Sequence, residues 1–173
     1  MSLALKYPPR YTIRDYERWE GDWELIEGVP YALASPTPLH QRVGALLVYL
    51  LEGLLEDCGD CFVLYETDWF ISDFTVVRPD LMVICGELKE RIEEPPKAVI
   101  EIVSPTSAER DEKLKFELYE REGVDYYILV YPERRKLKVY KRTPKGFALE
   151  KEKIDLEGCE IEIEQLKRVF EKL

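Results

Sequence analysis

The sequence predicts an α/β (α+β) fold in which helices flank a mixed β-sheet. β-rich runs alternate with segments of helical periodicity along most of the chain. A strand, a helix and a second strand follow one another between residues 97 and 131, an order typical of a crossover between parallel strands. With 173 residues, of which 46% are hydrophobic, the chain can bury one sizeable core, so we expect a single domain over residues 1–173.

Helical and β-rich patterns alternate in the first half of the chain. Thr12, with Asp15 three positions later, matches a capping box that opens a short helix. The segment WELIEGVPYALA predicts two short strands around a Glu27-Gly28 turn. Leu39 to Leu55 carries apolar residues at helical spacing and is predicted to be a long packing helix. Two β-rich runs follow, at residues 61–71 and 75–85.

The second half begins with KAVIEIV, a β-branched strand that Ser104-Pro105 ends. A helix is predicted over residues 107–122, with Gly123 closing it, and VDYYILVY is the next strand. A terminal hairpin over residues 135–152 and a last helix over residues 162–172 complete the predicted elements.

The charge of the chain limits how it can contact nucleic acid. A net charge of −10 excludes a protein that coats nucleic acid by overall electrostatics, so any contact with DNA must be local. One stretch without an acidic residue offers such a contact, through Arg134, Arg135, Lys136, Lys138, Lys141 and Arg142. The stretch predicts either a hairpin that contacts DNA or edge-strand lysines that prevent sheets from aggregating.

The apolar pattern of the chain indicates a cytoplasmic protein. No run of about 18 apolar residues is present, and the N-terminus becomes polar too soon for a signal peptide. We therefore expect the four cysteines to be reduced thiols. Cys58 and Cys61 form a lone C-x2-C pair, with Cys85 and Cys159 at unhelpful spacing for zinc, and the pair follows a helix, unlike a thioredoxin motif.

Glu101 is the most informative residue, because an ionised carboxylate in an apolar strand costs several kcal/mol unless it is paired or binds a metal. Asp80 opens the preceding apolar strand, so the two carboxylates meet at one end of the sheet if the strands are neighbours. On the helix after Glu101, four-residue spacing puts Asp111, Lys115 and Tyr119 on one face. Two carboxylates and an ammonium can bind Mg²⁺ or Mn²⁺, activate water and stabilise charge on a phosphoryl group.

These segments resemble a known family. RPDLMVI, VIEIVSPTS and the Asp111-x3-Lys115-x3-Tyr119 helix before GVDYYILVYP resemble the Uma-type restriction endonucleases, a branch of the PD-(D/E)XK nuclease superfamily. WELIEGVPYALASPTPLHQRV fits the opening segment of the same family, and the resemblance extends from about Tyr11 to Phe170. It implies a restriction-endonuclease-like core that cleaves DNA with Mg²⁺ or Mn²⁺, with Glu24, Asp80 and Glu101 as metal ligands.

The chain departs from the superfamily pattern at one position. The motif places a lysine two positions after the acidic residue, where this chain has Val103, and the resemblance makes Lys115 its counterpart. His40, the only histidine, is either a capping or packing residue or a group that contacts phosphate and lines the site. Tyr119 is expected to pack with its hydroxyl near the site.

We therefore expect a metal-dependent DNA endonuclease with Asp80, Glu101 and Lys115 as catalytic residues, acting as a homodimer if it cuts both strands. Val103 and the net acidity leave open a catalytically degenerate nuclease fold that binds nucleic acid or protein. A carboxylate-pair hydrolase such as a glycosidase is a third alternative. Structural alternatives also stay open, with Glu101 as an edge-strand residue paired with Lys97 or Lys115 and Asp80 as a strand-initiating residue.

Overall fold

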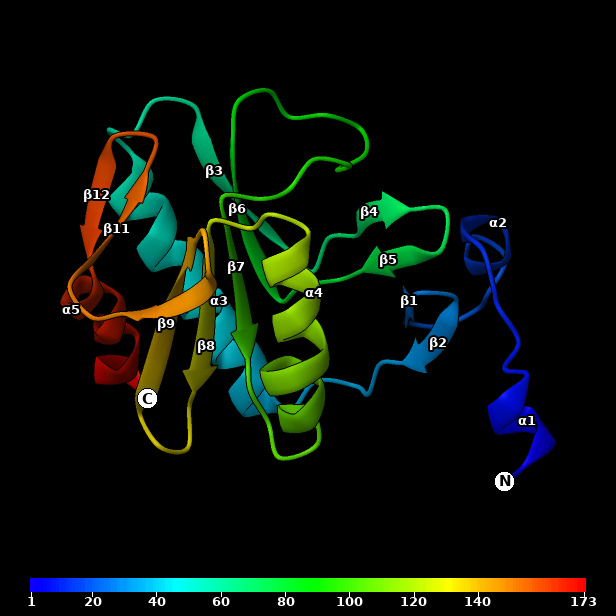
Figure 1. Ribbon diagram of the computed structural model, residues 1–173. Coiled ribbons are helices and arrows are strands. Elements are labelled where there is room, and N and C mark those ends of the chain that lie inside the picture. The colour runs from blue at the N-terminus through cyan, green and yellow to red at the C-terminus, as the bar shows by residue number, and fades with distance from the viewer. The chain divides into compact units, whose positions relative to one another are not determined.

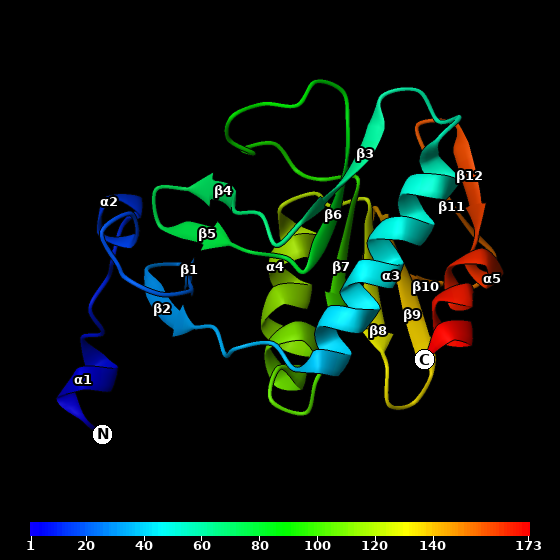
Figure 2. The same ribbon diagram turned by 180° about the vertical axis from the view of Figure 1, so that it is seen from behind.

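The structure is a computed structural model that describes residues 1–173. The chain forms two compact units, and each consists of separate stretches of sequence. The first unit contains Met1–Ser35, Asp68–Arg78 and Lys89–Glu94, and the second contains Pro36–Thr67, Pro79–Leu88 and Pro95–Leu173. Figures 1 and 2 show the elements of both units from opposite sides. The single domain expected over residues 1–173 stays a prediction.

The first unit is built on a four-stranded antiparallel sheet with the order β2-β1-β5-β4. Its elements are α1 (Leu3–Lys6), α2 (Ile13–Tyr16), β1 (Trp23–Ile26), β2 (Val29–Ala32), β4 (Trp69–Ser72) and β5 (Thr75–Val77). The predicted hairpin is confirmed, and its turn residues Glu27 and Gly28 have φ values of 51° and 84°. A two-residue hairpin turn of this kind needs positive φ at both positions, which explains the glycine. The predicted capping box is present, because the Thr12 amide donates to the Asp15 carboxylate.

The second unit is built on a six-stranded mixed sheet with the order β10-β9-β8-β7-β6-β3. Its strands are β3 (Cys61–Tyr65), β6 (Leu81–Cys85), β7 (Ala98–Ile102), β8 (Tyr126–Tyr131), β9 (Lys136–Thr143) and β10 (Gly146–Glu150). β7 and β8 run parallel, as the strand–helix–strand order predicts, and the other neighbouring strands are antiparallel. A mixed sheet flanked by helices is thus confirmed as the fold class.

Helices cover both faces of this sheet. α3 (Pro38–Leu55) packs its buried apolar side chains against the face that carries Ile100 and Ile102 of β7. α4 (Lys115–Arg121), which continues a short π-helix, η1 (Arg110–Leu114), lies on the opposite face, in front of the sheet in Figure 1, whereas α3 is in front in Figure 2. Side chains alternate between faces along a strand, so Glu101 points towards α4. No helix combines the length and the apolar character needed to cross a membrane.

The C-terminal part adds a small hairpin and a helical end. The hairpin consists of β11 (Lys153–Leu156) and β12 (Cys159–Glu162), and the end consists of α5 (Ile163–Leu166) and the 3₁₀ helix η2 (Lys167–Lys172). Both contribute apolar side chains to the core that α3 and the sheet share. The last helix was predicted from the sequence, whereas β11 and β12 were not.

The two long β-rich runs differ from the prediction, because each divides into two strands that belong to different sheets. Residues 61–71 divide into β3 and β4, and Glu66 between them has a φ of 47°, which is incompatible with a continuous strand. Residues 75–85 divide into β5 and β6, and Pro79 between them lacks the amide that a ladder needs. The edge-strand explanation for the basic stretch is also wrong, because β9 pairs with β8 on one side and with β10 on the other.

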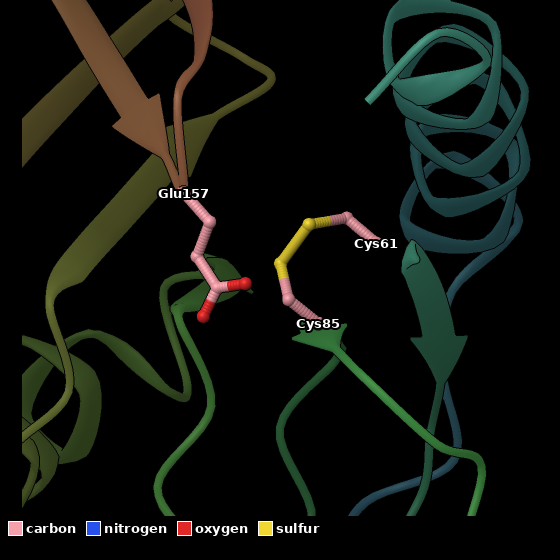
Figure 3. A group of neighbouring side chains, drawn as sticks. All are labelled: Cys61, Cys85 and Glu157. Carbon is pink, nitrogen blue, oxygen red and sulfur yellow. A yellow bond between two sulfur atoms is a disulfide. The ribbon is translucent and has the colours of Figure 1, made fainter. Parts of the chain in front are cut away.

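The expectation of reduced cysteines is wrong as well. The structure pairs Cys58 with Cys159 and Cys61 with Cys85, which leaves no free cysteine. Cys61 and Cys85 lie directly opposite each other on β3 and β6, and Figure 3 shows their disulfide beside Glu157. The partners are 101 and 24 residues apart in sequence, so only the folded topology brings them together.

Removing the Cys58–Cys159 disulfide is expected to destabilise the protein more than removing Cys61–Cys85. In the chain-entropy model the stabilisation grows with the length of the closed loop, here 101 against 24 residues of sequence separation. The double serine variant of the longer pair should lose about 2–4 kcal/mol of unfolding free energy, about 1 kcal/mol more than the variant of the shorter pair. Urea unfolding under oxidising conditions measures both. Equal stability of the wild type and both variants would show that the disulfides do not form.

Candidate functional site

Asp80 and Glu101 lie at the same end of the six-stranded sheet, because β6 and β7 are antiparallel neighbours. Leu81 of β6 pairs with Ile100 of β7, so the residue before Leu81 lies across from the residue after Ile100. Each carboxylate also accepts a backbone hydrogen bond from the other segment. The Asp80 amide donates to Glu101 Oε2 at 3.2 Å, and the Ile102 amide donates to Asp80 Oδ2 at 2.7 Å. The two carboxyl groups are therefore fixed relative to both strands.

The other oxygen of Glu101 faces α4. Lys115 Nζ lies 2.8 Å from Glu101 Oε1, and the Tyr119 hydroxyl donates to the same oxygen at 2.9 Å. All three residues are buried, with exposed fractions of 2% for Glu101, 3% for Lys115 and 0% for Tyr119. Since β7 is an interior strand, the edge position in the structural alternative for Glu101 is wrong, whereas the pairing with Lys115 that it also expected is present. Pairing and hydrogen bonding offset the cost of burying this carboxylate.

Asp111, Lys115 and Tyr119 are all buried, in agreement with the predicted shared face of the helix. The π-helix η1 was not predicted, and it widens the turn directly before Lys115. The Tyr127 hydroxyl, from β8, donates to the Asp111 carbonyl at 2.8 Å and so ties this turn to the sheet. Burial, followed by the negative charge of Glu101, raises the pKa of Tyr127 well above its usual value, so that hydroxyl stays a neutral donor.

His40 lies in the first turn of α3, and its part in the site stays a prediction. Its backbone amide donates to the Thr37 hydroxyl at the start of α3, and its imidazole Nε2 lies 3.0 Å from Asp80 Oδ1. The hydrogen bond with Asp80 raises the pKa of His40 above its usual value, although burial opposes the shift. His40 thus contacts the oxygen of Asp80 that does not accept the Ile102 amide.

Glu66 is the residue near Asp80 that sequence reasoning missed. One donor atom each from His40, Glu66 and Asp80 lies within 4.8 Å of the others. The Glu66 amide donates to the Asp80 carbonyl at 2.9 Å, an interaction that continues the β3–β6 pairing. Nothing in the local pattern around Glu66 signals this position, because it depends on the register between two distant strands.

Glu24 belongs to the first unit, whereas Asp80, Glu101, Lys115 and His40 belong to the second. Its side chain is fully buried on β1, and Oε1 accepts the Arg78 amide at 2.8 Å. The guanidinium of Arg78 in turn pairs with Asp68 and Asp22 of the same unit. The Glu24 carboxylate is thus held by a backbone amide of its own unit. The role of Glu24 as a third metal ligand stays a prediction.

A further group of metal-ligand residue types consists of Cys61, Cys85 and Glu157 (Figure 3). The two sulfur atoms are bonded to each other and so are not available as thiolates. Glu157 Oε1 lies 2.9 Å from Lys97 Nζ, which balances its charge. The group therefore consists of a disulfide crosslink and a neighbouring glutamate that forms a surface ion pair.

The Asp80–Glu101 end of the sheet has the composition of a divalent-cation site. Carboxylate oxygens are the ligands that Mg²⁺ and Mn²⁺ prefer, and two come from adjacent segments here. The Asp80 side chain is 19% exposed, so the buried Glu101 carboxylate lies next to one that solvent reaches. The residues therefore fit a cation that carries a water molecule, with the Lys115 ammonium close by.

Comparisons with known proteins identify a family and a similar fold. The Uma2 family model, described as "Putative restriction endonuclease", matches residues 13–168. The fold is similar to the crystal structure of a "putative nuclease belonging to DUF820" from Anabaena variabilis ATCC 29413. The two share 16% identity with a TM-score of 0.72, over 92% of this chain and 98% of that chain. No curated protein matches the sequence. The motif resemblance and the nuclease-like fold are thereby confirmed.

Replacing Lys115 by Met is expected to destabilise the protein by about 3 kcal/mol, because it leaves a buried carboxylate without its ammonium partner. The double variant Glu101→Gln/Lys115→Met removes both charges and should regain a large part of that loss. Urea unfolding gives the free energies. Lys113→Met is the matched control, since the Lys113 side chain is 74% exposed and its replacement should cost below about 0.5 kcal/mol. Equal stability of the two single variants would contradict the pairing.

Proposed function

The chain belongs to the Uma2 family, and from that premise we propose that it is an endonuclease that hydrolyses DNA phosphodiester bonds with a divalent cation. The observation that carries the proposal is the Lys115 ammonium 2.8 Å from the Glu101 carboxylate, which in turn accepts the Asp80 amide. This group unites the two acidic residues and the cationic residue that phosphodiester hydrolysis requires.

Asp80 and Glu101 are the proposed oxygen ligands of Mg²⁺ or Mn²⁺, and Glu24 is the proposed third ligand. A bound cation supplies a nucleophilic water at neutral pH and draws charge from the phosphoryl oxygens. Two backbone amides and Tyr119 hold the carboxylates in place, which reduces the reorganisation that ligand binding would otherwise need. Lys115 offers a positive charge that can offset negative charge on the phosphoryl oxygens.

The position of Lys115 also bears on the degenerate alternative. Val103 stands where the superfamily has its lysine, and its amide is bound to the Val130 carbonyl at 2.8 Å. An ammonium nevertheless reaches Glu101, from the helix instead of the strand. Buried ion pairs are weak contributors to stability, and apolar residues often serve as well or better. A buried lysine and glutamate at this point therefore support a chemical role over a structural one.

DNA contacts are proposed for the exposed part of the basic stretch. Two of its members already have partners in the second unit, because Arg142 pairs with Asp125 and Arg135 donates to the Leu173 carbonyl. Arg134, Lys136 and Lys141 are exposed in the turn before β9 and along β9. These three residues are the proposed phosphate contacts.

Incubation of supercoiled plasmid with the protein and Mg²⁺ or Mn²⁺ tests the activity. The wild type should nick or cut the plasmid, EDTA should stop the reaction, and Asp80→Asn or Glu101→Gln should reduce the rate about 100-fold or more. Asp80→Asn keeps an oxygen that can accept the Ile102 amide, so it separates ligand chemistry from folding. Lys113→Met should cleave like the wild type.

Two outcomes would contradict the proposal. Absence of cleavage by a folded wild type, together with DNA binding that survives Asp80→Asn, would reject the nuclease and favour the degenerate module. Cleavage that EDTA does not affect would reject the role of the divalent cation.

The DNA contacts are tested by the salt dependence of binding to a duplex. Replacing Arg134, Lys136 and Lys141 by Gln should weaken binding and lower the slope of log K against log salt by about 0.9 for each phosphate that is no longer neutralised. Replacing Lys145, Lys151 and Lys172, which are also exposed, changes the net charge by the same amount. This control should leave the slope unchanged. Equal effects of the two triple variants would assign the binding to overall charge.

A further inference from the structure

Three ligand-type side chains converge at Asp80. His40 comes from the first turn of α3, Glu66 follows β3, and Asp80 precedes β6, so three separate segments contribute one donor atom each. All three donor atoms lie within 4.8 Å of one another. The nuclease site proposed above accounts for Asp80 alone among these three residues.

The charges of this group call for a cation. Glu66 and Asp80 bring two carboxylates together, and like charges at this distance repel each other. The single imidazole of His40, even when protonated, balances only one of them. The backbone hydrogen bond from Glu66 to the Asp80 carbonyl keeps the two residues adjacent. Because Glu66 is exposed, an ion can reach the group from solvent.

We propose that His40, Glu66 and Asp80 form a second divalent-cation site, next to the Glu101 carboxylate and sharing Asp80 with it. The 3.0 Å between His40 Nε2 and Asp80 Oδ1 is a hydrogen-bond distance, and it also matches the spacing of about 3 Å between neighbouring ligands that lie about 2.1 Å from an octahedral ion. Asp80 can serve both sides, because Oδ1 faces His40 while Oδ2 faces the β7 backbone.

The donor set also selects the metal. Mg²⁺ is bound through oxygen ligands, whereas a neutral imidazole nitrogen suits transition metals and Zn²⁺. A site of one imidazole and two carboxylates is therefore a site for Zn²⁺ or Mn²⁺, with Mg²⁺ bound much more weakly. This preference distinguishes it from the all-carboxylate site at Asp80 and Glu101.

The second cation site adds to the proposed nuclease site, and any role of this site in catalysis rests on that proposed function. Cations that share a carboxylate can form a two-metal site, in which both the attacking and the leaving oxygen of a phosphodiester are stabilised. Binding at His40 and Glu66 does not depend on DNA cleavage, however, so the two proposals can fail separately.

The chain offers a direct readout, because it contains one histidine. In untagged, ¹⁵N-labelled protein every imidazole signal belongs to His40, and Zn²⁺ is the diamagnetic probe. Titration of Zn²⁺ should move the Nε2 resonance to that of a metal-bound nitrogen and remove its attached proton, in the wild type and in Glu101→Gln alike. Mg²⁺ at the same concentration should leave Nε2 protonated and hydrogen-bonded to Asp80.

Two glutamate variants complete the test. Glu66→Gln removes one of the three proposed ligands and should weaken Zn²⁺ binding at Nε2 more than about tenfold, because the loss of even a hydrogen-bond partner of a metal ligand costs that much. Glu56→Gln is the matched control, because Glu56 is exposed at the end of α3 and its replacement changes the charge equally. It should bind like the wild type.

The results separate this inference from the nuclease proposal. An Nε2 signal that Zn²⁺ does not move, or that moves equally in Glu66→Gln, would overturn the second site and leave a simple His40–Asp80 hydrogen bond. Zn²⁺ coordination in a protein that cleaves no DNA would uphold the site and reject the nuclease. DNA cleavage by a protein whose His40 does not coordinate Zn²⁺ would uphold the nuclease and reject the second site.

Discussion

The need to stabilise the buried carboxylate of Glu101 is the physical constraint on the arrangement of the second unit. An isolated charge in the interior would cost several kcal/mol, and the structure offsets this with three groups from two segments. Lys115 and Tyr119 of α4 bind one oxygen, and the Asp80 amide at the start of β6 binds the other. Removing either segment would leave an oxygen of this carboxylate without its partners. The contacts that form the candidate site therefore also hold α4 and the start of β6 against β7.

The topology of the sheet determines which segments can meet there. Parallel pairing of β7 with β8 requires a crossover, and the crossover carries η1 and α4 over the face towards which Glu101 points. Antiparallel pairing of β6 with β7 brings Asp80 to the same end. α3 lies on the opposite face, yet its first turn reaches Asp80 through His40. Residues from both faces thus meet at one end of β6 and β7.

The sequence predicts the parts of this arrangement that depend on local patterns. Glu101 stands out within an apolar strand, and helical phase selects Lys115 over Lys113, which is exposed in the structure. The Glu66 contact and the two disulfides escape prediction, because each depends on pairing between segments far apart in the chain. The π-helix before Lys115 also escapes, since its residues are ordinary helix formers.

The β3–β6 pair connects the crosslink with the proposed second cation site. At one end of this pair Cys61 lies opposite Cys85 and is bonded to it, and at the other end Tyr65 lies opposite Leu81. The next pair outward is Glu66 with Asp80, joined by a backbone hydrogen bond. A slip of one residue would turn every side chain of β3 to the other face and move Glu66 away from Asp80. The disulfide excludes that slip, so a bond at one end of the strand pair preserves the geometry of the ligand group at the other.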